Sequence, residues 1–240
     1  REKARRVRAI IRELPHVFFE FAENEKEFYD FSFIPNGIRR TDGSYYQFDQ
    51  TPLFRDTFHE VLIISPFLSS GIIRNFNNRN DKSLISNAVY MLITREMSLG
   101  RLKLEDVTHF RLFTMKDQII DGESAISEDV SSIQKQDIHA KIYLTRKYSD
   151  SCLYLGSLNA SHNAVYSNIE FMICLYAKNR YVNVQRLTTS LFGGEPDGPD
   201  NPFQEASGAS SGSLVILSMF FQLGSFWVCS SSRPSWLMCH

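Results

Sequence analysis

The sequence predicts an α/β domain with a mixed β-sheet flanked by helices. Short, continuous apolar runs recur along the middle of the chain, and such runs are typical of strands that are buried on both faces. Polar or helical segments separate these runs. Buried strands that alternate with helices indicate a layered α/β architecture.

The predicted strands cover residues 61–67, 88–94, 110–115, 138–144, 152–155 and 169–175. A helix is expected between the first two strands, and a second helix is expected over 160–166. A polar, acidic loop at 117–137 separates the third strand from the fourth. A polar hairpin at 145–151 reverses the chain between the fourth and fifth strands, which makes the predicted sheet mixed rather than parallel.

Length and composition match an ordinary globular protein. The chain has 240 residues, 43% hydrophobic and 22% charged, which excludes a disordered or fibrous protein and allows a sizeable core. The formal net charge of -1 gives no bulk basic field for nucleic-acid binding, although a local basic patch would be sufficient. The four cysteines show no C-x-x-C spacing, so we expect neither a zinc cluster nor a disulfide framework, and a cytoplasmic location.

Composition divides the chain into three regions. Residues 1–55 hold a basic N-terminal helix and an aromatic-rich segment, residues 56–192 form the α/β lobe, and residues 193–240 are a linker and an apolar tail of low charge. The basic helix has apolar residues at three- and four-residue steps and is expected to end at Pro15. Its charges could contact phosphates or form a solvated helix face, and we favour the solvated face.

The apolar run at 214–228 leaves three interpretations open: a marginal membrane anchor, a core helix for a partner lobe, or a tail without an evolved function. A bilayer span needs about 20 apolar residues, which is more than this run holds. The run also lacks the basic flanks that would orient it in a membrane. The abrupt change in composition favours the tail without function, and we expect no membrane partner.

Polar side chains gather where the fourth and fifth predicted strands meet the following loop. His139 and Lys141 are two residues apart on an extended strand and therefore share a face. Gly156 allows a tight turn at the end of the next strand, and Ser157 and Asn159 then supply polar side chains beside the histidine and the lysine. The sequence thus predicts one cluster of a cation, an amide, a hydroxyl and an imidazole.

Asn168 and Glu170 share a face at the start of the last predicted strand. We expect the N–H groups at the start of the 160–166 helix to face the same cluster. A lysine, an amide, a hydroxyl and a helix start describe a site for phosphate, and a histidine with a carboxylate to orient it suits covalent catalysis. No convergent carboxylates or cysteines suggest a metal, so we expect metal-independent chemistry at phosphorus and no cofactor.

These residues follow one another in an order that resembles a known family. The segments Ile138-His139-Ala140-Lys141-Ile142-Tyr143, Gly156-Ser157-Leu158-Asn159 and Asn168-Ile169-Glu170 are similar to the H-x-K…G-S-x-N…N-x-E pattern of the phospholipase D superfamily. The Ser-Pro-Phe ending of the 62–67 strand is also similar to the opening strand of that family's lobes. The resemblance covers roughly residues 56–192 and implies a phospholipase D-like lobe.

The resemblance implies a role for each residue of the pattern. His139 would attack phosphorus and form a phosphohistidine, which water or another alcohol then cleaves. Lys141, Asn159 and Ser157 would bind the non-bridging oxygens, and Glu170 would hold the far nitrogen of the imidazole. The chain departs from the family where an aspartate after the lysine would fall at Arg146, with Asp150 as an approximate substitute.

The family's active sites use two such motifs, and the second histidine protonates the leaving group. The remaining histidines do not repeat the pattern; they are His16, His59, His109, His162 and His240. We therefore expect a second phospholipase D-like lobe from a homodimer or from a segment missing from this sequence. The start at Arg1 rather than methionine favours a missing segment.

The function expected from the resemblance is phosphodiester hydrolysis by a nuclease, on DNA rather than RNA. The basic N-terminal helix gives mild support, because it could lie on a phosphate backbone. Two alternatives remain: a phospholipid hydrolase or transferase, and a non-catalytic binding lobe of a larger restriction or defence protein. A purely structural interpretation also exists, in which His139 and Lys141 form an ordinary half-buried strand face with Glu170 as their ion-pair partner.

Overall fold

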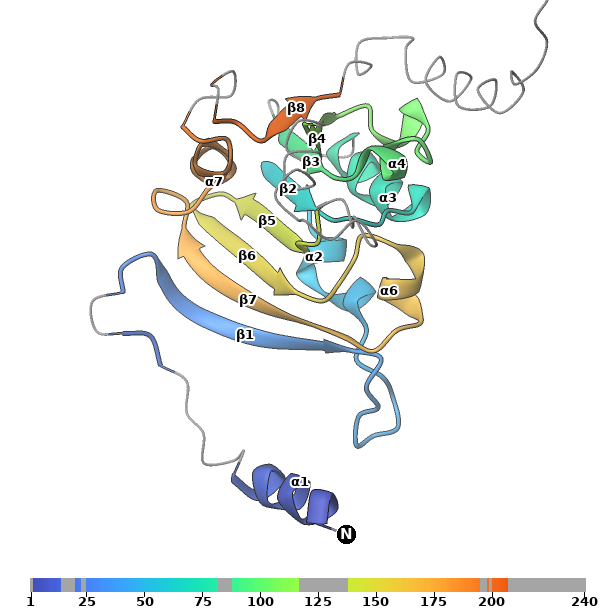
Figure 1. Ribbon diagram of the computed structural model, residues 1–240, viewed down its shortest axis with the longest axis vertical. Helices are drawn as coiled ribbons and strands as arrows, with labels where there is room; N and C mark the ends of the chain where they lie inside the picture. The colour runs from blue at the N-terminus through green and yellow to red at the C-terminus, as the bar shows by residue number, and fades with distance from the viewer. Residues whose placement is uncertain are drawn as a thin grey trace, which may run out of the picture.

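The computed structural model describes residues 2–13, 20–22, 25–81, 88–116, 138–194, 198 and 200–206. The strands in these ranges form one mixed sheet, ordered β1-β7-β6-β5-β2-β3-β4-β8, which confirms the predicted fold class (Figure 1). The strands are β1 (Phe28–Asn36), β2 (Glu60–Ile64), β3 (Val89–Ile93), β4 (Phe110–Met115), β5 (Ile142–Lys147), β6 (Asp150–Gly156), β7 (Glu170–Lys178) and β8 (Phe203–Glu205).

Helices cover both faces of this sheet. The helical segments are α1 (Glu2–Glu13), η2 (Phe48–Gln50), α2 (Pro52–Arg55), α3 (Ser70–Asp81), α4 (Glu96–Leu99), η3 (Leu104–Asp106), α6 (His162–Tyr166) and α7 (Val184–Leu191). Side chains of α2, α3 and α6 pack into one core, and side chains of α7 pack into a second core on the opposite face. The predicted helices at the N-terminus and after the first strand of the lobe are therefore present as α1 and α3.

The central strand β2 shows why the apolar runs were continuous. Val61 and Ile63 join the core beneath α3, whereas Leu62 and Ile64 join the core beneath α7. Because successive side chains of a strand point to opposite faces, a strand covered on both sides must be apolar at every position. The exposed fraction of each of these four side chains is at most 4%.

The directions of the strands bring the ends of several strands to one edge of the sheet, which is called the site edge below. Strands β2, β3 and β4 are parallel to one another, and β5 pairs antiparallel with β2. Strands β6 and β7 continue the antiparallel pairing. The carboxyl ends of β2, β3 and β6 therefore lie at the same edge as the amino ends of β5 and β7.

The strand predicted over 138–144 begins only at Ile142. Its last pair with β2 is Ile64↔Ile142, and β2 ends there. Pro66 lies just beyond this end, and a proline has no N–H group to donate to the next rung of a ladder. Residues 138–141 therefore run past the end of the sheet, although they are apolar enough to resemble a strand.

The sheet extends beyond residues 56–192 on both sides. Strand β1 pairs antiparallel with β7 from Phe28↔Ala177 to Asn36↔Glu170 and is the outermost strand on that side. Strand β8 pairs with β4 and is the outermost strand on the other side. Strand β1 was not predicted from the sequence, because polar residues interrupt its aromatic side chains. The aromatic-rich segment of the N-terminal region thus contributes an edge strand to the lobe.

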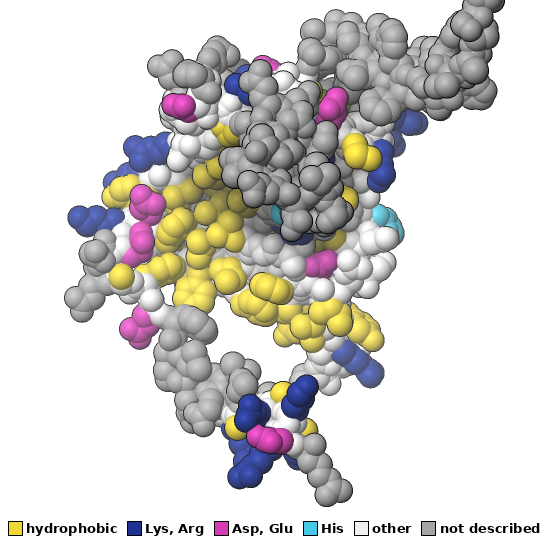
Figure 2. Space-filling model, in the orientation of Figure 1, with side chains coloured by type: hydrophobic (Ala, Val, Ile, Leu, Met, Phe, Trp, Pro, Cys, Tyr) yellow, Lys and Arg dark blue, Asp and Glu magenta, His cyan; other side chains and the backbone are white. Residues whose placement is uncertain are grey.

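Part of one sheet face carries exposed aromatic side chains. Phe33 of β1 is 60% exposed and Phe171 of β7 is 48% exposed, and their rings stack with centroids 5.8 Å apart. Figure 2 shows hydrophobic side chains gathered over the region of β6 and β7 that α7 leaves uncovered. The second core therefore covers this face only near α7.

Some expectations fall outside the described residues. They concern the acidic loop at 117–137, the Ser/Gly cluster at 207–213, the apolar run at 214–228 and the end of the first helix at Pro15. Within the ranges that the structure describes, no helix has the length and apolar composition needed to cross a bilayer.

Gly156 provides a test of how closely β6 and β7 approach at the site edge. A Cβ atom at this position would lie 2.8 Å from Met172 Sδ and 2.9 Å from Met172 Cα, and it would overlap the Phe171 carbonyl oxygen. We expect Gly156→Ala to lower the free energy of unfolding by about 1–3 kcal/mol, because backbone atoms must shift to admit the methyl group. Urea unfolding followed by circular dichroism measures this change.

The matched control for that variant is Gly71→Ala in α3. A Cβ at Gly71 would meet no atom within 4 Å, so this variant is expected to be neutral or to stabilise the helix by up to about 1 kcal/mol. Equal unfolding free energies for the two variants would contradict the close approach at Gly156.

Candidate functional site

The segment that follows β2 anchors the G-S-x-N loop. The Ser65 hydroxyl accepts a hydrogen bond from the Ala160 N–H (2.9 Å) and donates one to the Phe67 carbonyl (2.9 Å). The Ser69 N–H donates to the Ala160 carbonyl (2.9 Å), and the Ser69 hydroxyl accepts from the His162 N–H (2.9 Å). These bonds hold the loop after β6 against the loop after β2.

The same contacts correct the expectation for the 160–166 segment. Helix α6 spans only His162–Tyr166, and the Ser161 side chain caps it by accepting from the Ala164 N–H (3.4 Å). The N–H groups of Ala160 and His162 are bound by serine hydroxyls, as described above. The start of this helix therefore does not offer these N–H groups to a phosphate, because neighbouring hydroxyls accept from them.

Ser157 joins the end of β6 to β7. Its N–H donates to the Phe171 carbonyl (3.0 Å), and its hydroxyl accepts from the Phe171 N–H (3.0 Å). The side chain predicted to bind phosphate is thus also part of the strand pairing that places Glu170 beside the loop.

His139 and Lys141 lie directly before β5 and close to each other. The Lys141 ammonium donates to the His139 carbonyl oxygen (2.8 Å). The His139 side chain is exposed and Lys141 is half-buried, so the imidazole faces solvent with a cation beside its backbone. The predicted proximity of the histidine and the lysine is therefore present, although neither residue belongs to a strand.

Arg95 is a neighbour of His139 that the sequence did not indicate. It follows β3, and its Nη2 atom lies 3.3 Å from His139 Nε2. Its Nε atom donates to the Ile138 carbonyl (3.1 Å), and its guanidinium group lies over the Phe67 ring, 4.9 Å from the centroid. No motif marks this arginine, because only the parallel pairing of β2 with β3 brings it to the site edge.

Asn159 is half-buried, and its side-chain oxygen has no hydrogen-bond partner within the described part of the chain. A buried amide oxygen without a partner costs about 1–3 kcal/mol, so this acceptor is suited to a donor that a ligand or a charged side chain supplies. The predicted role of Asn159 in binding a non-bridging oxygen would fall to its side-chain NH2 group, because the amide oxygen only accepts.

Glu170 is the first residue of β7, and its carboxylate accepts a hydrogen bond from the Asn168 side-chain amide (3.0 Å). The Tyr143 hydroxyl donates to the Leu158 carbonyl (3.2 Å). Burial raises the pKa of Tyr143, and the nearby charge of Glu170 raises it further. This carboxylate therefore lies beneath the G-S-x-N loop, but within the described residues no hydrogen bond joins it to His139.

Asn36 supports the N-x-E segment from β1. This buried amide donates to the carbonyls of Ala164 (3.2 Å), Val165 (3.1 Å) and Asn168 (3.1 Å), and it accepts from the Phe48 N–H (2.9 Å). The Pro-Asn-Gly sequence around it is typical of a turn, and turn chemistry alone does not indicate a buried amide. Asn36 fixes the end of α6 and the backbone just before Glu170.

The residues near the expected family aspartate belong to ion pairs elsewhere. Arg146 bonds Glu60 (2.7 Å), and Asp150 bonds Lys178 (2.6 Å). Both pairs lie at the edge where β2 begins, opposite His139. They therefore connect neighbouring strands at the end of the sheet away from the candidate site.

The other described histidines do not join His139 in one cluster. His59 and His109 precede β2 and β4, at the edge opposite His139. His162 lies in α6, where its exposed ring is 4.8 Å from that of Tyr166. In the part of the chain that the structure describes, no three His, Cys, Asp or Glu side chains gather in a metal-binding group.

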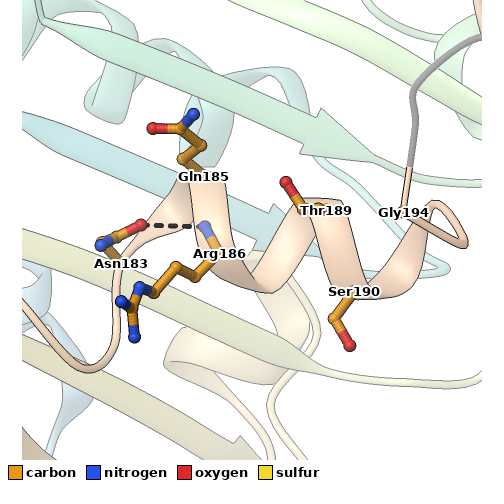
Figure 3. A pocket seen from close by; sticks show the side chains of 6 residues that line it. All are labelled: Asn183, Gln185, Arg186, Thr189, Ser190 and Gly194. Atoms are coloured by element: carbon orange, nitrogen blue, oxygen red, sulfur yellow. Dashed lines mark hydrogen bonds between the residues drawn. The ribbon is translucent and has the colours of Figure 1, made fainter.

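A shallow depression lies along α7 and is separate from this cluster (Figure 3). Its lining is polar and comes from Asn183, Gln185, Arg186, Thr189, Ser190 and Gly194. Helix α7 contacts β2 and β5 on the face opposite α3. The Asn183 side chain caps α7 by accepting from the Arg186 N–H (2.9 Å), so its polar oxygen serves the fold.

The site edge thus combines a solvent-exposed imidazole, two cations, an unpartnered buried amide oxygen and a carboxylate. Lys141 and Arg95 make the surroundings of His139 suited to an anion. An imidazole that is held beside cations is suited to attack at an anionic centre such as phosphorus.

No protein-family model matches the chain, and no curated protein matches it. Among solved structures, phosphatidylserine synthase from Haemophilus influenzae has a TM-score of 0.41 and 10% identity, covering 81% of this chain and 46% of that chain. Nuc from Salmonella typhimurium, a phospholipase D family member, has a TM-score of 0.37 and 12% identity, covering 63% of this chain and 86% of that chain. A mutant of yeast tyrosyl-DNA phosphodiesterase has a TM-score of 0.33 and 9% identity.

These structural neighbours belong to the phospholipase D superfamily, the family that the sequence motifs resemble. The match covers 49% of this chain and spans 24% of the yeast tyrosyl-DNA phosphodiesterase chain. All three TM-scores lie below 0.5, so the chemistry of the site is argued from this chain's own residues.

The support that Asn36 gives to the site can be measured. We expect Asn36→Ala to lower the free energy of unfolding by about 1–3 kcal/mol, because the Phe48 N–H and three carbonyls lose a buried partner. Asn75→Ala on the exposed surface of α3 is the control and should change it by less than about 0.5 kcal/mol. Urea unfolding of both variants makes the comparison. An unchanged free energy of unfolding in Asn36→Ala would contradict the supporting role of Asn36.

Proposed function

We propose that this chain hydrolyses phosphodiester bonds without a metal, through a phosphohistidine formed on His139, and that its substrate is nucleic acid. The observation that carries the proposal is the convergence of H-x-K, G-S-x-N and N-x-E at one edge of the sheet. The three motif segments come from separate parts of the chain, and the antiparallel pairing of β5, β6 and β7 supports the proposal because it puts the strand ends beside these segments at one edge.

The proposed reaction begins with attack by the lone pair of His139 Nε2 on phosphorus, while the bond from phosphorus to the leaving oxygen breaks. An acid supplied by a second lobe protonates that oxygen. Water then attacks phosphorus and gives a proton to the same group of the second lobe, which is now a base, while the P–N bond breaks and its electron pair returns to Nε2. Lys141 stabilises the charge on the non-bridging oxygens throughout, with Asn159 and Ser157 as further contacts.

The exposure of His139 supports a polymeric substrate. The His139 side chain is exposed at the end of the sheet, so a continuous phosphate backbone would have access to its imidazole. The basic residues of α1 would add a second, electrostatic contact to such a backbone, although the helix is equally compatible with a solvated face. DNA rather than RNA remains our expectation for the polymer.

The second lobe is proposed to come from another copy of this chain or from a segment outside this sequence, and the copy is the source that a mixing experiment can test. Of the described histidines, His59 and His109 lie at the opposite edge of the sheet, and His162 is not part of an H-x-K sequence, so within these ranges the chain places no second motif histidine beside His139. A two-fold dimer would bring two His139 side chains to face each other across one phosphate, with one acting as nucleophile and the other as acid.

Cleavage of plasmid DNA and of a chromogenic phosphodiester in EDTA tests the chemistry. We expect wild-type turnover to persist in EDTA and to fall about a thousandfold or more in His139→Ala, since the variant lacks the nucleophile. His109→Ala is the control, because His109 is an exposed histidine at the opposite edge. Loss of turnover on chelation, or a fully active His139→Ala protein, would refute the mechanism.

Phospholipid vesicles form a second substrate arm of that experiment. The exposed aromatic face around Phe33 and Phe171 favours a lipid substrate as the alternative, because it could contact acyl chains beside the site. Turnover of phosphatidylcholine vesicles with no DNA cleavage would replace the nuclease proposal. A protein that binds DNA but turns over none of the three substrates (plasmid DNA, the chromogenic phosphodiester and the vesicles) would be a binding lobe, and the proposal would be rejected.

The dimer is tested by mixing wild-type and His139→Ala chains under conditions that allow the subunits to exchange. If one site needs two histidines, mixed dimers are inactive and activity falls as the square of the wild-type fraction, to about one quarter at equal amounts. Independent sites would give a linear decline to about one half. Light scattering of the same samples establishes that dimers are present, and a linear decline would contradict the shared site.

A further inference from the structure

Arg95 lies beside the nucleophile although it belongs to none of the three motif segments. It is the second residue after β3, between that strand and α4. The preceding residue, Thr94, is fully buried, and its hydroxyl donates to the Ser65 carbonyl (2.6 Å). The backbone that carries Arg95 is therefore bonded to the same loop that anchors the G-S-x-N segment.

Three contacts fix the direction of the guanidinium group. Its Nε atom donates to the Ile138 carbonyl (3.1 Å), and its plane lies over the Phe67 ring. The Nη2 atom then lies 3.3 Å from His139 Nε2. Because an arginine bonded through Nε and stacked on a ring has few remaining rotamers, the group is positioned before any substrate binds.

The chemistry of the two groups determines what this contact means. A guanidinium carries only N–H donors and stays protonated, so the imidazole nitrogen that it contacts must present a lone pair. The contact therefore favours the tautomer in which Nε2 presents its lone pair and Nδ1 carries the proton. The nitrogen with the lone pair is the one required for attack on phosphorus.

The same position places the guanidinium beside the phosphate during the reaction. A phosphorus within attacking distance of Nε2 carries its non-bridging oxygens about 1.5 Å further out, which is within hydrogen-bond reach of an Nη2 atom beside Nε2. Arginine binds such oxygens through two parallel N–H groups. As the substrate enters, the Nη2 N–H group of Arg95 can exchange its contact with the imidazole lone pair for a hydrogen bond to a non-bridging oxygen. Nε2 of His139 is then free to attack phosphorus.

We propose that Arg95 is a catalytic residue of this site: it binds a non-bridging oxygen of the phosphodiester and keeps Nε2 of His139 unprotonated until the substrate arrives. This inference rests on the proposed function. It adds a cation from the β3 end of the sheet to Lys141, so that the developing negative charge is held from two directions.

Kinetics of Arg95→Gln and Arg95→Lys with the chromogenic phosphodiester test the proposal. We expect kcat/KM to fall about a hundredfold or more in Arg95→Gln and less in Arg95→Lys, which keeps the charge but loses the paired donors. Added guanidinium chloride, at millimolar concentrations well below those that denature, should restore part of the activity of Arg95→Ala. A purely structural arginine would not give this rescue.

Arg111→Gln is the matched control. Arg111 also lies over a phenylalanine ring, that of Phe113, and bonds Glu205, but it belongs to β4 near the opposite edge. We expect its kcat/KM to stay within about twofold of wild type, as for surface substitutions away from a site. Urea unfolding of all variants shows whether a loss of activity merely follows a loss of folded protein.

The outcomes separate this inference from the proposed function. An inactive wild-type protein, or activity that does not depend on His139, would reject the proposed function itself. If wild-type cleavage depends on His139 but Arg95→Gln stays within about threefold of wild type, only the role of Arg95 is overturned. The role of Arg95 would also be overturned if the variants lost activity only in step with a lowered unfolding midpoint and added guanidinium restored none of that activity.

Discussion

The antiparallel pairing of β5 with β2 is the constraint on which the candidate site depends. Strands β2 and β3 run parallel, so their carboxyl ends meet at one edge, and the reversed β5 must begin at that edge. His139, which lies just before β5, therefore meets Arg95, which lies just after β3. A parallel β5 would have placed the histidine at the opposite edge, where β2 and β3 begin, away from Arg95.

Buried polar groups then hold the loops at this edge in one conformation. Ser65, Thr94 and Asn36 each connect two loops, and each hydrogen bond would leave a buried donor or acceptor unsatisfied if the loops moved apart. Each of these bonds joins the side chain of Ser65, Thr94 or Asn36 to a backbone group rather than to a motif side chain. These bonds connect the loops at the site edge, while the side chain of His139 stays exposed.

Much of the central sheet could be predicted from apolar runs, because β2 and β3 are buried on both faces and their sequences show it. Strand β1 could not, since it is an edge strand with aromatic side chains on an exposed face. Residues 138–141 had the composition of a strand, yet they extend beyond the end of β2 and have no partner for a ladder. The free N–H groups expected near Ala160 are bound by serine hydroxyls from a loop that the sequence pattern does not connect to them.

The sequence by itself determined which reactive side chains this protein has and their order along the chain, from His139 and Lys141 through Asn159 to Glu170. It determined this because residue type and local spacing are carried within each short segment. Only the tertiary structure decided that Arg95 lies against the imidazole of His139 from 44 residues away, and that Asn36 of β1 bonds the backbone just before Glu170. Such neighbours depend on strand order and register, which are settled by how whole faces of the sheet pack and not by any single stretch of residues.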